Sequence, residues 1–331
     1  MSTAVNIKLF LLCISLSLIV GCASRPTGPD VFSFGVMGDM QYNAVEEEQF
    51  LKLTDAMNAE KFAFVVHLGD FKAGSNAVCS DQLFQRRLAE FNRFQAALIF
   101  TPGDNDWVDC RRPTNGATNP IARLNKIRDI FYPTTLSLGQ QPISLTRQSD
   151  AFVGEPVLSR YRENVFWLHK GIVFVTLNVQ GSNDNVGFDS ENDAEQLERH
   201  RANLAWLDIA VNRARGTDIV GLAVMIHANP GFEATSAEVA KSAYGPFLQA
   251  VEKNIANLNK PTLFIHGDTH TYRVDKPYKS PIDKRPIANM IRIETDGSPR
   301  MDWTRISVDT NNKVAPFYIE RGEFNPTVEP F

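Results

Sequence analysis

Short apolar runs alternate along the chain with segments of helical periodicity. The runs are rich in β-branched and aromatic residues and end at polar or glycine-containing turns, which is typical of buried strands. Six of them come before residue 270: Phe32–Met37, Phe62–Val66, Leu98–Phe100, Ile172–Leu177, Ile219–Ile226 and Thr262–Ile265. Three more predict antiparallel strands near the end of the chain: Ile287–Ile293, Trp303–Val308 and Val314–Ile319.

Four segments between these runs carry apolar residues three and four positions apart, as in helices that pack on a core. Their stripes begin at Phe50, Leu83, Leu204 and Phe247. The alternation of strands and helices predicts a layered α/β fold. Residues 113–160 differ, because they contain five prolines and one helical stretch near Ile121–Ile130. They predict a long, loop-rich excursion over one rim of a single domain that spans 31–331.

The first 21 residues have the pattern of a secretory signal peptide. Lys8 is the only charged residue before the apolar run Leu9–Val20, whose twelve residues are too few to cross a bilayer. The run leads into Ile-Val-Gly-Cys, which ends at Cys22 and is similar to a bacterial lipobox. No Asp follows Cys22, so we expect lipidation there, a tether over 22–30 and a lipoprotein of the bacterial cell envelope that faces the periplasm from the outer membrane. An ordinary signal peptide with an incidental cysteine is the alternative.

Charge and cysteine content narrow the function classes. The 331 residues include 34 Lys and Arg against 38 Asp and Glu, so the chain lacks the basic excess typical of proteins that bind nucleic-acid polymers. Four cysteines are too few for a disulfide scaffold. Cys13 would leave with the signal peptide and Cys22 would take the lipid. In an oxidising compartment the remaining pair, Cys79 and Cys110, predicts a disulfide, with two free thiols as the alternative.

Acidic and imidazole side chains concentrate where predicted strands end. Four of them belong to Gly-Asp pairs and two are histidines: Asp39, Asp70, Asp104, Asp268, His227 and His270. In α/β folds the carboxyl ends of parallel strands border the ligand crevice. Carboxylates gathered there repel one another and raise each other's pKa, and a bound cation removes that penalty. The pattern therefore predicts a metal site.

The order of these residues resembles the calcineurin-like metallophosphoesterase superfamily over about residues 32–275. The family's blocks are Asp-x-His, Gly-Asp, Gly-Asn-His-Asp/Glu, a lone His and Gly-His-x-His. In their places the chain has Asp39-Met40-Gln41, Gly69-Asp70, Gly103-Asp104-Asn105-Asp106, His227 and Gly267-Asp268-Thr269-His270. These variants are also similar to a divergent, secreted bacterial subgroup. The resemblance implies a four-layer αββα sandwich with two mixed β-sheets, and two metals bridged by one carboxylate.

Carried over by position, the resemblance implies two metal sites that share Asp70. The first would take Asp39, Gln41, Asp70 and His270, and the second would take Asp70, Asp104, His227 and Asp268. Asn105 and Asp106 stand where the family has its catalytic histidine and the residue that orients it. The resemblance therefore assigns catalytic roles to Asn105, Asp106 and His227.

Three departures from the family pattern bear on the chemistry: Gln41, the pair Asp104 and Asp268 in place of Asn and His, and Asn105. Gln41 replaces a histidine, and its amide oxygen is an uncharged, weak ligand. The four carboxylates make the ligand set rich in oxygen, which favours one or two ions of Mn²⁺, Mg²⁺ or Ca²⁺, with Fe or Zn left open. Asn105 cannot act as an acid, so we expect either another acid or a substrate whose leaving group departs easily.

Neighbouring residues are candidates for smaller roles, each with a structural alternative. Arg111 and Arg112 would hold a phosphate or else form surface charge. Asn178 would line the pocket or belong to a polar turn. Lys72 would neutralise a phosphate or pair with a carboxylate, and His67 is expected to be buried.

Together these features predict a metal-dependent phosphoesterase that hydrolyses a phosphomonoester, phosphodiester or phosphoanhydride and is anchored by lipid outside the cytoplasm. Its partners would be a phosphorylated small molecule or nucleotide and the membrane, and no nucleic-acid polymer. A binding protein with degraded catalysis on the same fold is the alternative, which Gln41 and Asn105 keep open. The sequence lacks the motifs of serine hydrolases, P-loop enzymes and His-Glu-x-x-His metalloproteases.

Overall fold

A computed structural model of the chain describes residues 25–276 and 286–324. The predicted signal peptide, 1–21, and the predicted lipidation site, Cys22, lie outside these residues. Within the described part of the chain, no helix combines the length and the hydrophobicity that a membrane span requires.

The first of two mixed β-sheets is built from both ends of the described chain. Its strands are β1 (Val31–Met37), β2 (Phe64–His67), β3 (Ala97–Phe100), β11 (Trp303–Asp309) and β12 (Phe317–Gly322). They lie in the order β12-β11-β1-β2-β3. Strands β1, β2 and β3 are parallel, whereas β11 is antiparallel to β1 and β12 to β11.

The second sheet comes from the middle of the chain. Its strands are β4 (Thr146–Arg147), β5 (Val165–His169), β6 (Ile172–Thr176), β7 (Gly221–Met225), β8 (Thr262–His266), β9 (Arg273–Asp275) and β10 (Met290–Glu294). They lie in the order β4-β5-β6-β7-β8-β10-β9. The four neighbours β6, β7, β8 and β10 are parallel, and the remaining strands pair antiparallel at the two sides.

In the described part of the chain, five longer helices accompany the sheets: α1 (Ala44–Ala59), α2 (Asp81–Phe91), α3 (Pro120–Phe131), α6 (Ser190–Ala214) and α8 (Gly245–Ala256). Short helices are α4 (Gln148–Ala151), α5 (Gly181–Asp184), α7 (Ser236–Val239), η1 (Val108–Arg111), η2 (Pro113–Asn115) and η3 (Leu158–Arg160). The N-termini of α1, α2, α3 and α6 are capped by side chains that accept backbone N–H groups. These side chains are Asn43, Ser80, Asn119 and Asp189. Such caps satisfy donors that a helix leaves unpaired, so the sequence fixes where these helices begin.

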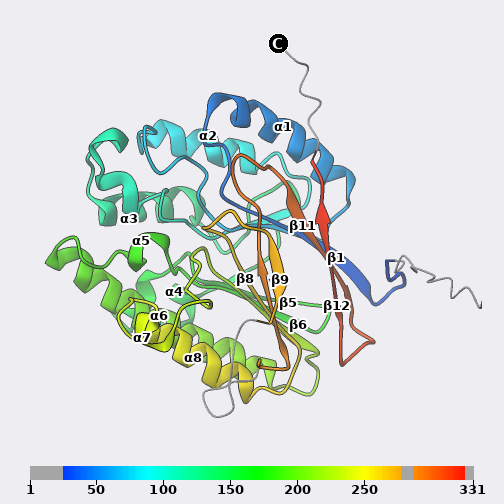
Figure 1. The fold of residues 1–331 in the computed structure, drawn as a ribbon. Coiled ribbons are helices and arrows are strands. Elements are labelled where there is room, and N and C mark those ends of the chain that lie inside the picture. Colours follow the sequence, from blue (N-terminus) through cyan, green and yellow to red (C-terminus); the bar gives the residue numbers. More distant parts are fainter. Residues whose placement is uncertain (1–24, 277–285, 325–331) are drawn as a thin grey trace, which may run out of the picture.

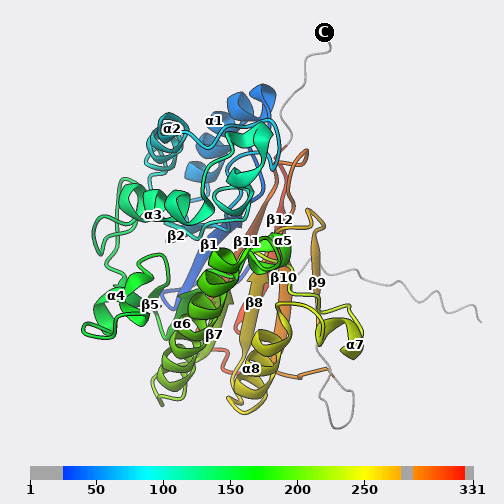
Figure 2. The ribbon, with the colours of Figure 1, turned by 90° about the vertical axis from the view of Figure 1, so that its left-hand side faces the viewer.

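The elements form four layers with three apolar cores between them. Helices α1, α2 and α3 cover the outer face of the first sheet, and α6 and α8 cover the outer face of the second (Figures 1 and 2). Between the sheets, Phe174 of β6 packs edge-on against Phe34 of β1 and Phe64 of β2, with ring centroids 5.3 and 5.0 Å apart. The predicted αββα sandwich with two mixed sheets is therefore confirmed.

One predicted pairing is wrong. The run 287–293 overlaps β10, which was expected to be antiparallel but pairs in parallel with β8 and antiparallel only with the short β9. A parallel neighbour needs a return connection, and β9, which is antiparallel to β10, lies between β8 and β10 in the chain. The excursion at 113–160 holds α3, β4 and short helices, and it pairs with the first sheet through a bridge between Leu98 and Leu138.

The last residue of β2, His67, is a fully buried histidine, as predicted. Burial lowers the pKa of His67 to about 3, and the nearby His227 acts in the same direction. Nδ1 of His67 accepts the backbone N–H of Gly69 at 3.1 Å, which requires that nitrogen to be unprotonated. An unfolded histidine titrates near pH 6.5, so as the pH falls the unfolded chain takes up a proton first.

We therefore expect His67 to make the protein less stable as the pH falls from about 6.5 towards 3. Urea unfolding of the wild type and of His67→Asn across this range measures the effect. The difference in free energy of unfolding between wild type and variant should be largest above pH 6.5 and should shrink below it. Parallel pH profiles for the two proteins would contradict the prediction.

Candidate metal centre

The parallel strands of both sheets end at one edge of the sandwich. Asp39, Asp70 and Asp104 follow β1, β2 and β3 of the first sheet, and His227 and Asp268 follow β7 and β8 of the second. The two edges are joined by the residues beyond β10, because the N–H of Ser298 donates to the Asp39 carbonyl at 2.6 Å. Both sheets therefore deliver polar side chains to the same place.

The loops that carry the carboxylates are tightly packed. Asp39, Asp70 and Asp268 have φ of 55°, 56° and 77°, in the left-handed region that Asp adopts more readily than most residues. Glycines allow the backbone to approach these side chains. A Cβ on Gly103 would lie 2.0 Å from Oδ1 of Asp70, and one on Gly267 would lie 2.3 Å from Oδ2 of Asp39. Gly103 and Gly267 thus make room for carboxylates that belong to neighbouring loops.

His227 lies at the centre of the cluster. Its Nε2 is 3.0 Å from Oδ1 of Asp104, 3.5 Å from Oδ1 of Asp70 and 3.8 Å from Oδ1 of Asp268. Its Nδ1 donates to the Leu68 carbonyl at 2.8 Å, since a carbonyl oxygen can only accept. The imidazole is therefore oriented so that Nε2 faces the carboxylates.

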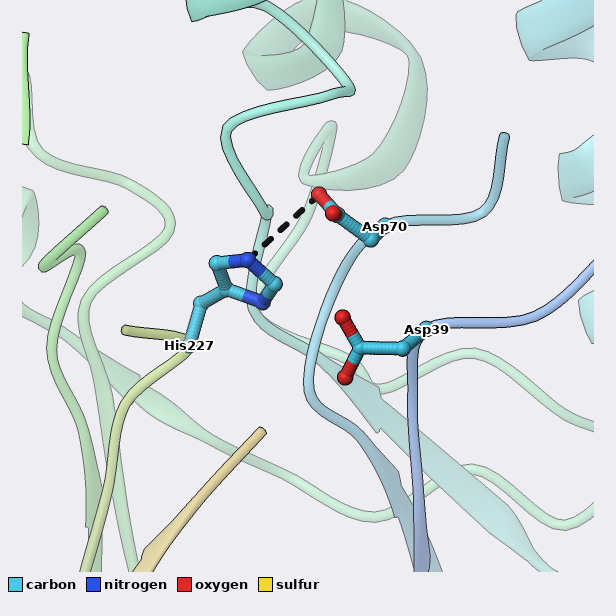
Figure 3. Close-up of side chains that lie close together, drawn as sticks. All are labelled: Asp39, Asp70 and His227. Carbon is cyan, nitrogen blue, oxygen red and sulfur yellow. Dashed lines mark ion pairs between the residues drawn. The ribbon is translucent and has the colours of Figure 1, made fainter. Parts of the chain in front are cut away.

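Two groups of ligand atoms share His227. In Figure 3, Asp39 and Asp70 extend from the first-sheet loops and His227 faces them from the second. One ligand atom from each of Asp39, Asp70 and His227 lies within 4.8 Å of the others, and the same holds for Asp104, His227 and Asp268. At the other side of the cluster, Nε2 of His270 is 3.6 Å from Oδ1 of Asp39.

Electrostatics favour a cation at this place. Burial alone would lower the pKa of His227, but Asp70 and Asp104 raise it well above its ordinary value. Burial raises the pKa of Asp70 well above its usual range despite His227, and the like charge of Asp104 adds to the shift. Burial also raises the pKa of Asp268 to about 6. The chain by itself keeps protons in the cluster that a divalent cation would displace.

The donor set fits such a cation. Carboxylate oxygens and imidazole nitrogens are ligands for first-row divalent metals, and four carboxylates formally balance two of them. Further contacts orient the ligands, as is usual at metal sites. The hydroxyl of Ser182 donates to Oδ2 of Asp104 at 2.6 Å, and the N–H of Asn229 donates to Oδ2 of Asp268 at 3.1 Å.

Comparison with known families agrees with this arrangement. A family profile described as calcineurin-like phosphoesterase matches residues 32–272, which include both groups of ligand atoms. The chain belongs to the calcineurin-like phosphoesterase family. No curated protein matches the chain.

Several solved structures are similar to this calcineurin-like chain. The structure of PhoD is similar with a TM-score of 0.53 and 11% sequence identity, over 87% of this chain and 65% of that chain. A dimetal phosphatase from Danio rerio has a TM-score of 0.47 and 13% identity, over 89% of this chain and 99% of that chain. A 5'-nucleotidase from Candida albicans has a TM-score of 0.47 and 10% identity, over 88% of this chain and 51% of that chain.

Asp106 organises the loops of the first sheet in this calcineurin-like domain. Its carboxylate accepts the backbone N–H groups of Gly103, Asp70 and Phe71 at 2.7 to 2.9 Å. Burial raises the pKa of Asp106 to about 6, and these hydrogen bonds oppose the shift. The N–H of Asn105 donates to Oδ1 of Asp70 at 2.9 Å, so the predicted catalytic pair lies directly beside the ligands.

The side chain of Gln41 is anchored towards α2. Its Nε2 donates to Oε2 of Glu90 at 2.9 Å. Its Oε1 is buried and has no hydrogen-bond partner among the described residues. No hydrogen bond within the described chain links Gln41 to the carboxylate cluster, so its role as a ligand stays a prediction.

Sequence reasoning missed three residues that touch the cluster: Tyr42, Ser182 and Asn229. The hydroxyl of Tyr42 lies 3.2 Å from Oδ2 of Asp70 and accepts from Nδ2 of Asn105 at 3.2 Å. Tyr42 follows the first motif directly, which is the one signal that could have found it. Ser182 and Asn229 stand in polar turns after β6 and β7, and the sequence does not distinguish them from other turn residues.

The expected role of Asn178 in the pocket does not agree with its placement. Asn178 is fully buried, and its Nδ2 donates to Glu163 at 2.8 Å while its Oδ1 accepts from Gln180. Its carbonyl accepts from Arg199 and Asn203. Asn178 therefore belongs to a buried polar network beneath the site, because a polar group that leaves water needs such partners.

The two arginines proposed to hold phosphate are occupied by other groups. Arg112 pairs with Asp109 at 2.7 Å and donates to the Gly74 carbonyl. Arg111 lies over the ring of Phe188, 3.2 Å from its centroid, and is 3.6 Å from Asp109. These contacts neutralise Asp109, which in turn accepts from Ser182 at 3.2 Å. Binding of substrate by the two arginines remains a prediction.

The predicted disulfide is confirmed. Cys79 and Cys110 are bonded, with their Cα atoms 5.7 Å apart. Sγ of Cys110 lies 3.3 Å from the carbonyl oxygen of Asp106. On the same side, the buried Nζ of Lys72 donates to the Asn105 carbonyl at 2.7 Å. The disulfide and Lys72 therefore support the backbone that carries Asn105 and Asp106, and Lys72 contacts a carbonyl rather than a carboxylate.

A cavity of about 420 Å³ adjoins the cluster between the first turns of α1 and α2. We call it the α1–α2 cavity. Its lining is polar and includes Tyr42, Asn43, Lys72, Gln82 and Arg86. Tyr42 therefore separates the carboxylate cluster from a space large enough for part of a small molecule.

We expect Gly181→Ala to weaken metal binding by at least about tenfold, as loss of supporting contacts does at metal sites. A Cβ on Gly181 would lie 2.5 Å from Oδ1 of Asp104 and 2.7 Å from Oδ1 of Asp268, in the space between two ligand atoms. Calorimetric titration with Mn²⁺ measures the affinity. In the control, Gly187→Ala, the added Cβ meets no atom within 4 Å although φ is 95°. Equal affinities for wild type and Gly181→Ala would refute the prediction.

We expect replacement of both Cys79 and Cys110 by Ser to weaken metal binding as well as stability. The loop of Asp106 loses a covalent support, and removal of a disulfide costs about 2–5 kcal/mol in a small domain. Thermal unfolding and Mn²⁺ titration of the double variant report the two effects separately. Lower stability with unchanged affinity would show that the disulfide serves stability alone.

Proposed function

We propose that this member of the calcineurin-like family is a metal-dependent phosphoesterase that hydrolyses a phosphomonoester, phosphodiester or phosphoanhydride. The observation that carries the proposal is the meeting of both sheet edges at one cluster. There, four carboxylates and two histidines converge, and two groups of three have ligand atoms within 4.8 Å of one another. Such a cluster lowers the stability of the protein unless a cation neutralises it. Its presence is therefore better explained by a function than by a structural role.

The residues that would hold metal are Asp39, Asp70, Asp104, His227, Asp268 and His270. Divalent ions bound there would supply charge neutralisation for a phosphoryl group and a nucleophile at neutral pH. Protein contacts orient the central residues so that a ligand atom of each faces the cluster. The Leu68 carbonyl does this for His227, and the N–H of Asn105 does it for Asp70.

Asn105 and Asp106 have different tasks in this proposal. Asp106 is fully buried and accepts three backbone N–H groups, so it positions the loops and does not touch substrate. Asn105 borders the cluster, and its amide would donate a hydrogen bond to a phosphoryl oxygen. An amide cannot protonate a leaving group, so we infer that the natural substrate releases a good one.

The lining of the α1–α2 cavity favours a substrate whose leaving group is polar. Arg86 and Lys72 give it positive charge, although Glu47 pairs with Arg86 at 2.9 Å. Asn43 and Gln82 add amide groups. A nucleotide or a second phosphate fits this lining better than an apolar group, since the cavity offers hydrogen bonds at most positions.

The proposal also includes a place of action. We infer that the protein is a lipoprotein of the bacterial cell envelope, anchored through Cys22 and facing the periplasm. The sequence before residue 25 supports this inference, and the disulfide between Cys79 and Cys110 agrees with an oxidising compartment.

The test is hydrolysis of paired aryl phosphomonoester and aryl phosphodiester substrates after loading with Mn²⁺, Mg²⁺, Ca²⁺ or Zn²⁺ separately. We expect metal-dependent turnover of at least one substrate. Asp70→Ala removes a carboxylate that both ligand groups approach, so kcat/KM should fall by at least about a hundredfold. An alkyl phosphate should react more slowly than its aryl counterpart, because Asn105 offers no acid.

Two results would contradict the proposal. Absence of turnover with every metal, in a folded protein that retains metal, would favour a binding protein on the same fold. Equal rates for aryl and alkyl phosphates would remove the inference about the leaving group and leave the hydrolase itself in place.

A further inference from the structure

Tyr42 places a phenol oxygen among the ligand atoms of the centre. Its Oη lies 3.2 Å from Oδ2 of Asp70, 3.5 Å from Oδ1 of Asp39 and 3.3 Å from Nε2 of His270. A neutral phenol has one proton to donate, and Nδ2 of Asn105 already donates to the same oxygen at 3.2 Å. A hydrogen bond from Tyr42 therefore accounts for only one of these three short contacts.

The separations are those of atoms that share one ion. Ligand atoms about 2.0–2.2 Å from an ion lie about 2.8–3.6 Å from one another in octahedral or tetrahedral arrangements. The three distances from Oη of Tyr42 fall between 3.2 and 3.5 Å. Nε2 of His270 and Oδ1 of Asp39 are 3.6 Å apart. All four separations lie within the expected interval.

The backbone explains why Tyr42 and not Gln41 reaches this place. Asp39 and Gln41 both have left-handed φ, at 55° and 70°. Met40 between them is buried in the core beneath α1 and α2. With this backbone, the side chain of Gln41 points to Glu90, and the hydroxyl of Tyr42 lies in the cluster.

The buried carboxyl group of Glu46 fixes the positions of Tyr42 and His270 relative to each other. Oε2 of Glu46 accepts the backbone N–H of Tyr42 at 2.9 Å, and Oε1 accepts the hydroxyl of Ser298 at 2.7 Å. The carbonyl of Ser298 in turn accepts from Nδ1 of His270 at 2.7 Å. Glu46 is only 4% exposed. The buried side chain of Glu46 thus positions these two residues, as groups that hydrogen-bond to metal ligands commonly do.

We propose that Tyr42 ligates the first metal position, together with Asp39, Asp70 and His270, in place of Gln41. The assignment deepens the proposed phosphoesterase function and rests on it for the presence of metal. When the oxygen takes the ion, the O–H bond breaks and the proton leaves to solvent, as for other ligands that bind in the deprotonated form. Three anionic oxygens then favour a hard, highly charged ion at this position.

The test compares Tyr42→Phe with Gln41→Ala in the full-length protein. Tyr132→Phe is the matched control, because its hydroxyl is also buried but donates to the Phe100 carbonyl, away from the cluster. Calorimetric titration with Mn²⁺ measures stoichiometry and affinity. We expect Tyr42→Phe to lose one bound ion or to bind it at least about tenfold more weakly. Gln41→Ala and Tyr132→Phe should bind as the wild type does.

A spectroscopic readout separates ligation from hydrogen bonding. A phenolate bound to Fe³⁺ absorbs visible light by charge transfer, whereas a phenol that only donates a hydrogen bond does not. We expect the protein loaded with Fe³⁺ to show this band in the wild type and in Tyr132→Phe. The band should be absent in Tyr42→Phe.

Unchanged Mn²⁺ binding by Tyr42→Phe would overturn the assignment, as would a visible band that persists in this variant. A fall in affinity without any band in the Fe³⁺-loaded wild type would also overturn it, because Tyr42 would then act only as a hydrogen-bond partner of the carboxylates. Turnover is not a readout here. A protein that binds metal through Tyr42 and hydrolyses no phosphate would reject the proposed function alone.

Discussion

The repulsion among carboxylates that gather at one edge of the sandwich is the constraint on which the rest of the site depends. Asp39, Asp70 and Asp104 come from the first sheet and Asp268 comes from the second. His227 lies within 3.8 Å of three of them, and its single positive charge offsets only part of their negative charge. Close packing of Gly-Asp loops makes this crowding possible, and a cation makes it favourable.

The two sheets hold their parts of the cluster by different means. On the first sheet, Asp106 gathers the backbone N–H groups of neighbouring loops, and the disulfide and Lys72 support the same segment. On the second, the fully buried Arg199 pairs with Asp184 at 2.6 Å and donates to the Asn178 carbonyl. This network fixes α5, whose Ser182 reaches Asp104. Neither support contacts a substrate, yet both set the positions of ligand atoms.

The sequence predicted the layers and most of the cluster because both depend on local patterns. Apolar runs marked the strands, and parallel strands bring their carboxyl ends together, so Asp70 and His227 meet as expected although 157 positions separate them (227 − 70). Tyr42 was missed because its approach depends on left-handed φ at Asp39 and Gln41, and neither residue type requires that conformation. The same holds for Asn178, whose burial depends on partners such as Glu163 and Arg199 that lie far away in the chain.

The joining of the two sheet edges has a thermodynamic consequence. Since the ligand atoms belong to both sheets, an ion bound by all of them would crosslink the sheets, and its binding free energy would add to their cohesion. Metal affinity and the packing between the sheets are then linked quantities. Loosening of the inter-sheet contact between Phe34 and Phe174, which lies within the strands and away from the cluster, would lower the affinity for the ion as surely as damage to a ligand.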